Sequence, residues 1–157
     1  MGLTGKLIAQ LEFKAGGDVF HEFFRHKPHQ LADACVGKVH ACDLVEGEFG
    51  NAGCVVFFKY SQDGKEQSAK MVLDTIDEEK KSLVVKVLEG DVMQFYKSFT
   101  ITVHVETKDG IDHVTWTLEY EMKSEDVPHP ISWLAYYIDI TVDVETHHLG
   151  KSKMFIP

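Results

Sequence analysis

Seven stretches of this chain alternate apolar and polar residues, and all seven come before a single long segment of helical character. Alternation with a period of two predicts strands that are buried on one face, a pattern typical of antiparallel sheets. Turns rich in Gly and Asp separate most of the stretches, as expected for hairpins. The predicted strands cover residues 3–14, 38–46, 54–60, 66–76, 82–88, 99–105 and 114–122.

The segment after the last predicted strand differs from the strands in composition. Residues 131–149 contain neither Gly nor Pro, and two prolines stand just before them. Proline suits the start of a helix, so we expect one helix of about 28 Å at 1.5 Å per residue, capped at its end by Gly150. Two short helical pieces are expected after the first strand, one with Asp18 as its N-cap and one over residues 31–35.

The order of these elements predicts one α+β domain. A chain of 157 residues is long enough for one hydrophobic core and too short for two full domains. A seven-stranded antiparallel sheet curls strongly, and the simplest packing lays the long helix across its concave apolar face. We expect the domain to span residues 1–151 and residues 152–157 to form a disordered tail.

Charge and composition exclude several classes of partner. The chain has 16 Lys and Arg against 25 Asp and Glu, a net charge of −9. A field of that sign repels phosphate backbones and anionic lipid, so we expect no nucleic acid and no membrane as partner. The N-terminus lacks the pattern of a signal peptide. Three cysteines without a CxxC spacing are typical of free thiols in a reducing compartment, so we expect a cytoplasmic location.

Motifs that suggest other chemistry have simpler interpretations. The glycine-rich segment 46–53 lacks the Lys-Ser/Thr pair of a phosphate-binding loop and joins two strands, which favours a structural turn. Among the nine histidines, His26 and His29 are close, and His147 and His148 are adjacent, but no metal-ligand spacing occurs. The cysteines have no visible activating base. We therefore expect no metal, no cofactor and no covalent catalysis.

A large set of aromatic and aliphatic side chains remains. The chain has ten Phe, five Tyr and two Trp. On the long helix, an i, i+4, i+7, i+11 stripe indicates the buried face. That stripe consists of Trp133, Tyr137, Ile140 and Val144, with Tyr136 at its margin. From periodicity alone, such residues form either a filled core or the wall of a cavity.

Six short segments, taken in order, carry a resemblance to a known family. They are Gly2-Leu3-Thr4-Gly5-Lys6-Leu7, Glu46–Gly53, Val87-Leu88-Glu89-Gly90-Asp91, Val114-Thr115-Trp116, Glu119-Tyr120-Glu121 and His147-His148-Leu149. Together they resemble the major latex protein branch of the plant Bet v 1 and PR-10 superfamily, over residues 2–151. The resemblance implies a helix-grip fold (Bet v 1-like or START-like). In that fold a seven-stranded antiparallel sheet wraps around the C-terminal helix, two short helices follow the first strand, and an internal hydrophobic cavity lies between sheet and helix.

The resemblance also implies a function. Related proteins bind steroids, flavonoids, cytokinins or alkaloids, so we expect a carrier, store or defence-related sensor of small hydrophobic plant metabolites, monomeric or weakly dimeric. Some relatives are enzymes, and the alternative is a cofactor-free isomerase or cyclase acting on an iridoid, terpenoid or alkaloid intermediate, not a hydrolase. A third possibility is a stress protein that acts through protein partners, with Ile138 and Val142 on the outer face of the helix.

The candidate site is the concave apolar face. No catalytic residue is identified; for an enzyme, the candidate polar groups are Tyr60, Tyr96, Tyr120 and Tyr137. The lysine of the condensing relatives has no counterpart on the inward face of 114–122. The expected ligand-binding residues are Phe23, Phe58, Tyr60, Leu83, Val85, Val87, Met93, Phe99, Ile101, Trp116, Leu118, Tyr120, Trp133, Tyr136, Tyr137 and Ile140.

Overall fold

The sheet of this protein has seven antiparallel strands in the order β1-β7-β6-β5-β4-β3-β2. The computed structural model describes the backbone of residues 3–154 and the side chains of residues 3–150. The strands are β1 (Thr4–Glu12), β2 (Val39–Glu46), β3 (Val55–Gln62), β4 (Lys65–Asp77), β5 (Ser82–Gly90), β6 (Tyr96–Lys108) and β7 (Ile111–Met122). The alternating pattern therefore predicted every one of these strands.

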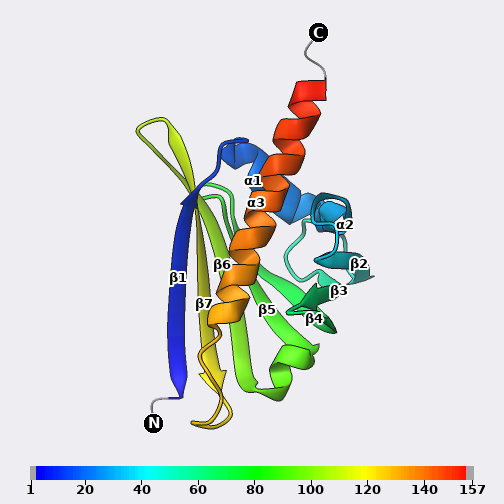
Figure 1. The fold of residues 1–157 in the computed structure, drawn as a ribbon, viewed down its shortest axis with the longest axis vertical. Helices are drawn as coiled ribbons and strands as arrows, with labels where there is room; N and C mark the ends of the chain where they lie inside the picture. Colours follow the sequence, from blue (N-terminus) through cyan, green and yellow to red (C-terminus); the bar gives the residue numbers. More distant parts are fainter. Residues whose placement is uncertain (1–2, 155–157) are drawn as a thin grey trace.

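The helices occupy three places in the chain. Three short ones follow β1, one precedes β6, and the longest follows β7. They are α1 (Gly17–His26), η1 (Pro28–Gln30), α2 (Leu31–Ala34), η2 (Asp91–Gln94) and α3 (Ile131–Met154). Helix α3 lies diagonally across one face of the sheet, and α1 and α2 lie beside its C-terminal half (Figure 1). The predicted α+β helix-grip architecture is confirmed.

Two predicted helix ends are wrong. Gly150 does not cap α3, because the helix runs through it to Met154. The first residues of the predicted tail, 152–154, are therefore helical, while 155–157 lie outside the described residues. Asp18 is not an N-cap either; it stands in the first turn of α1, and Gly16 occupies the cap position with a φ of 102°. A left-handed φ of that size favours glycine.

The start of α1 is completed by a side chain from β7. The backbone N–H of Gly17 donates to Asp112 Oδ2 at 2.7 Å, and the Thr107 hydroxyl donates to the same carboxylate. These two hydrogen bonds stabilise the ionised form, and they lower the pKa of Asp112 below its ordinary value of 3.8. The carboxylate thus supplies the cap that the local sequence of α1 lacks.

This contact predicts a pH-dependent contribution to stability. A lowered carboxyl pKa stabilises the fold above the pKa of the unfolded chain, and that contribution is lost as the pH falls through the folded pKa. We expect the free energy of unfolding to drop below about pH 4, and to drop less steeply in Asp112→Asn. Urea unfolding from pH 3 to 7 measures this. Asp109→Asn, an exposed position in the same hairpin, is the control; equal pH slopes for Asp112→Asn and the wild type would contradict the assignment.

Candidate functional site: an apolar cavity beneath the long helix

A cavity of about 120 Å³ lies between α3 and the concave face of the sheet. Side chains from α1, η1, α2, all strands from β2 to β7, and α3 form its wall. The lining is almost entirely aliphatic and aromatic, and Arg25 is the one charged residue on it within the described part of the chain. Such a lining selects ligands chiefly by the apolar area they bury.

Many of the residues predicted from the sequence lie on this wall. The structure places there Phe58, Tyr60, Leu83, Val85, Ile101, Trp116, Trp133, Tyr136, Tyr137 and Ile140. These residues come from four strands and one helix, so the fold gathers them from distant parts of the chain. That they contact a ligand remains a prediction.

The other predicted residues face inward but lie outside the cavity, which corrects their placement. They are Phe23, Val87, Met93, Phe99, Leu118 and Tyr120. Phe99 and Tyr120 pack with Tyr96 at ring-centroid distances of 5.4 and 5.7 Å. The ring of Trp133 contacts that of Phe99 at a centroid distance of 6.3 Å. This aromatic cluster packs against Trp133 at the start of α3. The helix residues on the cavity wall are Trp133, Tyr136, Tyr137 and Ile140, so the hollow does not extend along the whole helix.

The sequence prediction omitted part of the wall. The omitted residues are Phe24, Arg25, Pro28, Leu31, Val39, Cys54, Val56, Met71, Leu73 and Val103. Val56 on β3 and Val103 on β6 share the parity of predicted neighbours, so a full extension of the period-two pattern would have found them. Met71 and Leu73 share one face of β4, a strand from which no residue was predicted. Those on α1, η1 and α2 carry no such signal, because their facing depends on how the insertion packs against the sheet.

Trp116 and Tyr137 form a rigid part of the wall. Their rings stack with centroids 4.9 Å apart and an interplanar angle of 16°. The indole Nε1 of Trp116 donates to the Thr141 hydroxyl at 2.8 Å, and that hydroxyl donates to the backbone carbonyl of Tyr137. One turn of α3 therefore holds both rings in place.

The tyrosine hydroxyls differ in their partners. Tyr60 donates to Gln67 at 3.3 Å, and Tyr136 donates to the carbonyl of Lys38 at 2.7 Å. Outside the cavity, Tyr96 donates to the carbonyl of Pro128, and Tyr120 shares a hydrogen bond with His129. Each of these hydroxyls has a partner within the fold. A ligand that used one of them would have to replace that hydrogen bond.

Tyr137 is the exception on the wall. Its hydroxyl makes no hydrogen bond to any of the described residues. Burial, followed by the nearby Tyr136, raises the pKa of Tyr137 above its ordinary value of 10. The group therefore stays protonated, and it is available as both a donor and an acceptor inside an apolar cavity.

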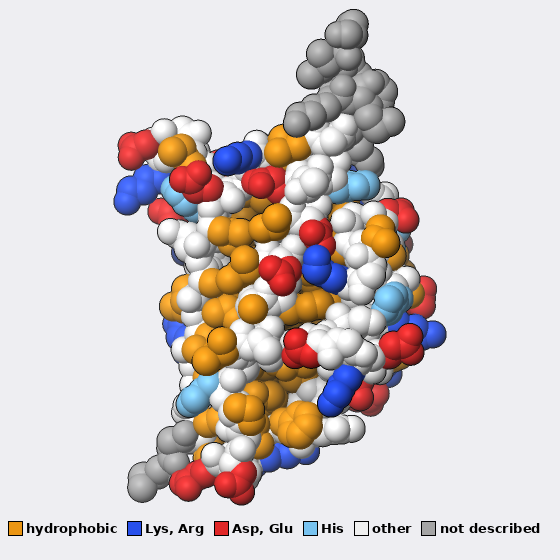
Figure 2. All heavy atoms as spheres, in the orientation of Figure 1, with side chains coloured by type: hydrophobic (Ala, Val, Ile, Leu, Met, Phe, Trp, Pro, Cys, Tyr) orange, Lys and Arg blue, Asp and Glu red, His pale blue; other side chains and the backbone are white. Residues whose placement is uncertain are grey.

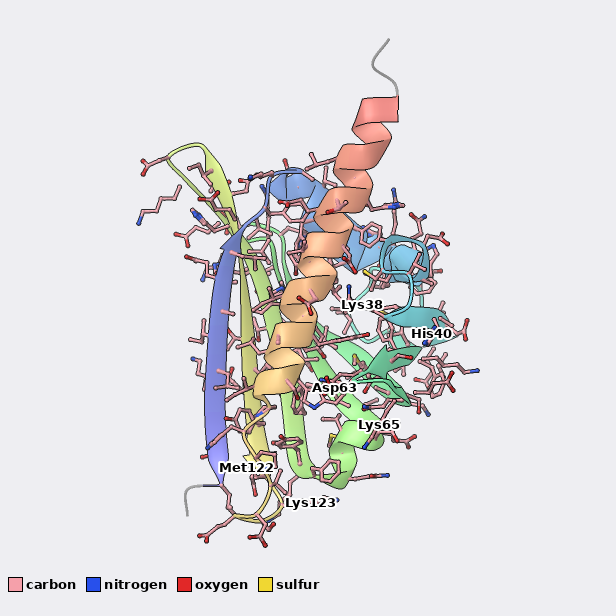
Figure 3. The ribbon with its side chains drawn as sticks, in the orientation of Figure 1. Lys38, His40, Asp63, Lys65, Met122 and Lys123 are labelled. Carbon is pink, nitrogen blue, oxygen red and sulfur yellow. The ribbon has the colours of Figure 1, made fainter. Side chains whose placement is uncertain are left out.

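Lys38 ties α3 to the start of β2 beside the cavity. Its ammonium nitrogen lies 2.6 Å from Asp143 Oδ2, and its carbonyl accepts the bond from Tyr136. Figure 3 shows Lys38 next to the middle of the helix. The hydrogen bond to Asp143 raises the pKa of Lys38 above 10.5. This pair of contacts closes one side of the site.

Arg25 closes the end of the cavity under α1. Its Nε donates to the carbonyl of Gly50 at 2.9 Å, and its guanidinium also pairs with the Glu78 carboxylate. His21 contacts the same carboxylate at 2.7 Å. The hydrogen bonds from His21 and then Arg25 lower the pKa of Glu78. The charge of Arg25 is thus compensated by Glu78 and does not by itself call for an anionic ligand.

The glycine-rich loop between β2 and β3 provides the carbonyl of Gly50 that accepts the hydrogen bond from Arg25. Gly50 has a φ of 90°, and a Cβ there would lie 2.0 Å from the ring of His26. Only glycine permits that approach of the loop to α1. The structural interpretation of segment 46–53 therefore accounts for Gly50.

The cysteines and Lys70, a strand lysine whose facing the sequence alone leaves open, have the environment of structural residues. Burial raises the pKa of Cys35 to about 12, and burial raises that of Cys42 to about 12 as well. Neither thiol is a nucleophile at neutral pH. Lys70 pairs with Glu89 at 3.7 Å, while its strand neighbour Ala69 is buried, so this lysine is on the outer face. No group of three or more metal-ligating side chains forms among the described residues.

The cavity is smaller than the resemblance implies. Pockets for small molecules usually measure ~300–1,000 Å³, against about 120 Å³ here. Aromatic rings account for the difference, since Trp133 and Tyr136 contact Tyr60 across the space at centroid distances of 5.6 and 5.8 Å. A ligand larger than benzene therefore requires these rings to move.

A curled antiparallel sheet, one long helix across it and an apolar cavity between them define a helix-grip ligand-binding domain. The family model described as "Pathogenesis-related protein Bet v 1 family" matches residues 2–151. The chain belongs to this family. No helix among the described residues is long and apolar enough to cross a membrane.

The relatives place the chain among major latex-like proteins. MLP-like protein 43 of Arabidopsis thaliana is 40% identical over 95% of this chain and 96% of its own. Two further MLP-like proteins of that plant are 38% identical, and the chain spans just under half of their length. The crystal structure of major latex-like protein 151 from Panax ginseng is 46% identical, covers 94% of this chain and 99% of its own, and superposes with a TM-score of 0.92.

A more distant structure shows the same fold in an enzyme. Norcoclaurine synthase from Thalictrum flavum, in complex with dopamine and hydroxybenzaldehyde, is 18% identical over 92% of this chain and 88% of its own, with a TM-score of 0.72. At this identity the likeness concerns the fold alone.

Proposed function

We propose that this protein binds small hydrophobic metabolites in the cavity beneath α3, as a cytoplasmic carrier, store or defence-related sensor. The cavity wall carries the proposal, because it is apolar and offers one hydroxyl, that of Tyr137, without a partner among the described residues. A ligand that fits is mainly apolar and bears a single hydroxyl or carbonyl group near Tyr137. Membership of a family that generally binds ligands supports this proposal.

Affinity in such a site comes from buried area. Each Å² of apolar surface removed from water contributes about 25 cal/mol, so covering about 300 Å² of ligand contributes roughly 7 kcal/mol before association costs. Part of that gain is spent on moving the rings that occupy the cavity. We therefore expect micromolar affinity and tolerance of several ligand shapes.

Calorimetric titration tests the proposal. A panel of one steroid, one flavonoid, one cytokinin and one alkaloid is titrated into the purified protein. Saturable binding of at least one compound, with a negative heat-capacity change, is the expected result. Absence of saturable heat with every member of the panel would contradict the proposal.

Tyr137 provides a test of the polar anchor. We expect Tyr137→Phe to weaken binding of a hydroxyl-bearing steroid by about 2–10-fold and to leave binding of its deoxy analogue unchanged. Only the hydroxyl-bearing steroid can form a hydrogen bond with the Tyr137 hydroxyl that the substitution removes. Tyr136→Phe is the matched control: its hydroxyl already donates to Lys38, so its loss affects stability and not the preference between the two ligands. An unchanged preference in Tyr137→Phe would show that Tyr137 is not the anchor.

The alternative is a cofactor-free isomerase or cyclase. The fold is shared with norcoclaurine synthase, and a protonated Tyr137 is able to polarise a carbonyl. The wall, however, presents no Asp, Glu, His or Lys from the described residues to accept a proton. Binding is therefore the better-supported function. An enzymatic function predicts that a candidate substrate gives a different product distribution with the protein than in the spontaneous reaction.

A further inference from the structure

One edge of the sheet is left without a partner by the rest of the fold. Strand β1 pairs with β7 along one side, and no described element pairs with its other side. Figure 1 shows β1 at the border of the sheet, with α3 lying inward of it. An uncovered edge strand presents a row of free backbone N–H and C=O groups to a partner.

The two edge strands of this sheet differ. Strand β2, at the opposite edge, has two irregularities in its register with β3, and α2 packs beside it. Bulges and covering elements are devices that prevent edge-to-edge pairing. Strand β1 pairs with β7 in unbroken register from Thr4 to Glu12 and contains no proline. Strand β1 therefore has neither the register irregularities nor the covering helix that protect β2 from pairing with another strand.

The direction of the free groups follows from two hydrogen bonds at the ends of this pairing. Met122 N–H donates to the carbonyl of Leu3, and Phe13 N–H donates to the carbonyl of Asp112. Odd-numbered residues of β1 thus bond to β7. The backbone groups of the even-numbered residues, from Thr4 to Glu12, point to the open edge.

Apolar side chains lie along this edge on both faces of the sheet. Ile8 is 59% exposed on the outer face, while Leu7 and Leu11 on the inner face are only partly buried, as is Leu134 of α3. Figure 2 shows a band of hydrophobic side chains between β1 and α3. A second strand added at this edge would cover part of that band.

We propose that a second copy of this chain pairs with β1 in antiparallel orientation about a two-fold axis at Ala9. In this register Lys6 lies opposite Glu12 of the second copy, and the pair occurs twice by symmetry. Leu7 lies opposite Leu11 of the second copy on the inner face, and Ile8 lies opposite Gln10. The even-numbered residues face one another, as the free backbone groups require.

Charge complementarity selects this register over its neighbour. An axis at Ile8 also pairs even-numbered residues, but it places Lys6 opposite Gln10 and leaves both charges without a partner. The strand is thus complementary to itself in one register, which favours a second copy over an unrelated strand. Since no residue of β1 lines the cavity, dimerisation and ligand binding are separate properties of the molecule.

Sedimentation of the full chain and two charge variants tests the proposal. We expect the wild type to convert from monomer to dimer between about 1 µM and about 500 µM. Lys6→Glu places carboxylates opposite each other in the dimer, and Glu12→Lys places two ammonium groups opposite each other, so each variant is expected to weaken dimerisation by at least about tenfold. Mixed in equal amounts, the two variants restore opposite charges at every pair, and we expect a heterodimer.

The controls separate dimerisation from folding. Lys6 also lies opposite Glu119 within the same sheet, so thermal unfolding of each variant must be measured alongside. Lys97→Glu, an exposed change on β6 away from β1, should dimerise as the wild type does. A wild type that stays monomeric over the whole range, or a variant mixture that stays monomeric, would overturn the proposal and leave the edge to a different partner.

Discussion

Replacing Val85 with Trp is expected to abolish ligand binding while leaving the protein folded. Val85 lies on the cavity wall in the middle of the sheet, and an indole at this position occupies the space of about 120 Å³ that a ligand must enter. Excluding about 100 Å² of ligand surface removes about 2.5 kcal/mol of binding free energy, or roughly 70-fold in affinity. Calorimetric titration with the best ligand of the panel measures the loss.

The neighbouring residue supplies a matched control. Val84 belongs to the same strand, and its side chain points to the opposite face of the sheet. Val84→Trp should therefore bind as the wild type does. Equal binding by Val85→Trp and the wild type would place the ligand elsewhere, whatever the effect of Val84→Trp.

Phe20→Ala is expected to lower the free energy of unfolding by about 3–5 kcal/mol. Phe20 is 1% exposed, and its ring contacts Phe13, Phe24 and Trp116 at centroid distances of 5.0, 4.5 and 6.2 Å. The substitution leaves a hole between α1 and the sheet that the rigid surroundings cannot fill. Urea unfolding followed by circular dichroism gives the value.

Val19 on the same helix is the control for this prediction. It is 38% exposed, so Val19→Ala should change the free energy of unfolding by no more than about 0.5 kcal/mol. A loss below about 1 kcal/mol in Phe20→Ala would mean that α1 is not anchored through this ring.

The strands could be predicted from the sequence because burial on one face imposes a period of two on the side chains. The helix ends could not. At the start of α1 the cap comes from Asp112, 95 residues away along the chain, and no local pattern records that contact. Gly150 was expected to end α3, but it has no left-handed φ and keeps the helix going. Glycine permits a helix end without requiring one.

The cavity wall was predictable only in part, for a similar reason. Ile101 and Phe99 share one face of β6, yet the first lines the cavity and the second belongs to the aromatic cluster under the start of α3. The period-two position of a residue predicts which face of the sheet its side chain is on. The position of the helix over that face determines whether the side chain lines the cavity or packs against an aromatic ring. Likewise, nothing in the local pattern shows that four tyrosine hydroxyls have partners in the fold while that of Tyr137 does not.

Intrinsic tryptophan fluorescence tests the central claim most directly. The chain has two tryptophans, Trp116 and Trp133, and both lie on the cavity wall, so a ligand in the cavity changes the signal of the whole protein. Titration with the ligand panel should give a saturable change with a stoichiometry of one, present in Val84→Trp after correction for the added indole and absent in Val85→Trp. A signal that never saturates with any member of the panel, or one that survives unchanged in Val85→Trp, would contradict binding in this cavity.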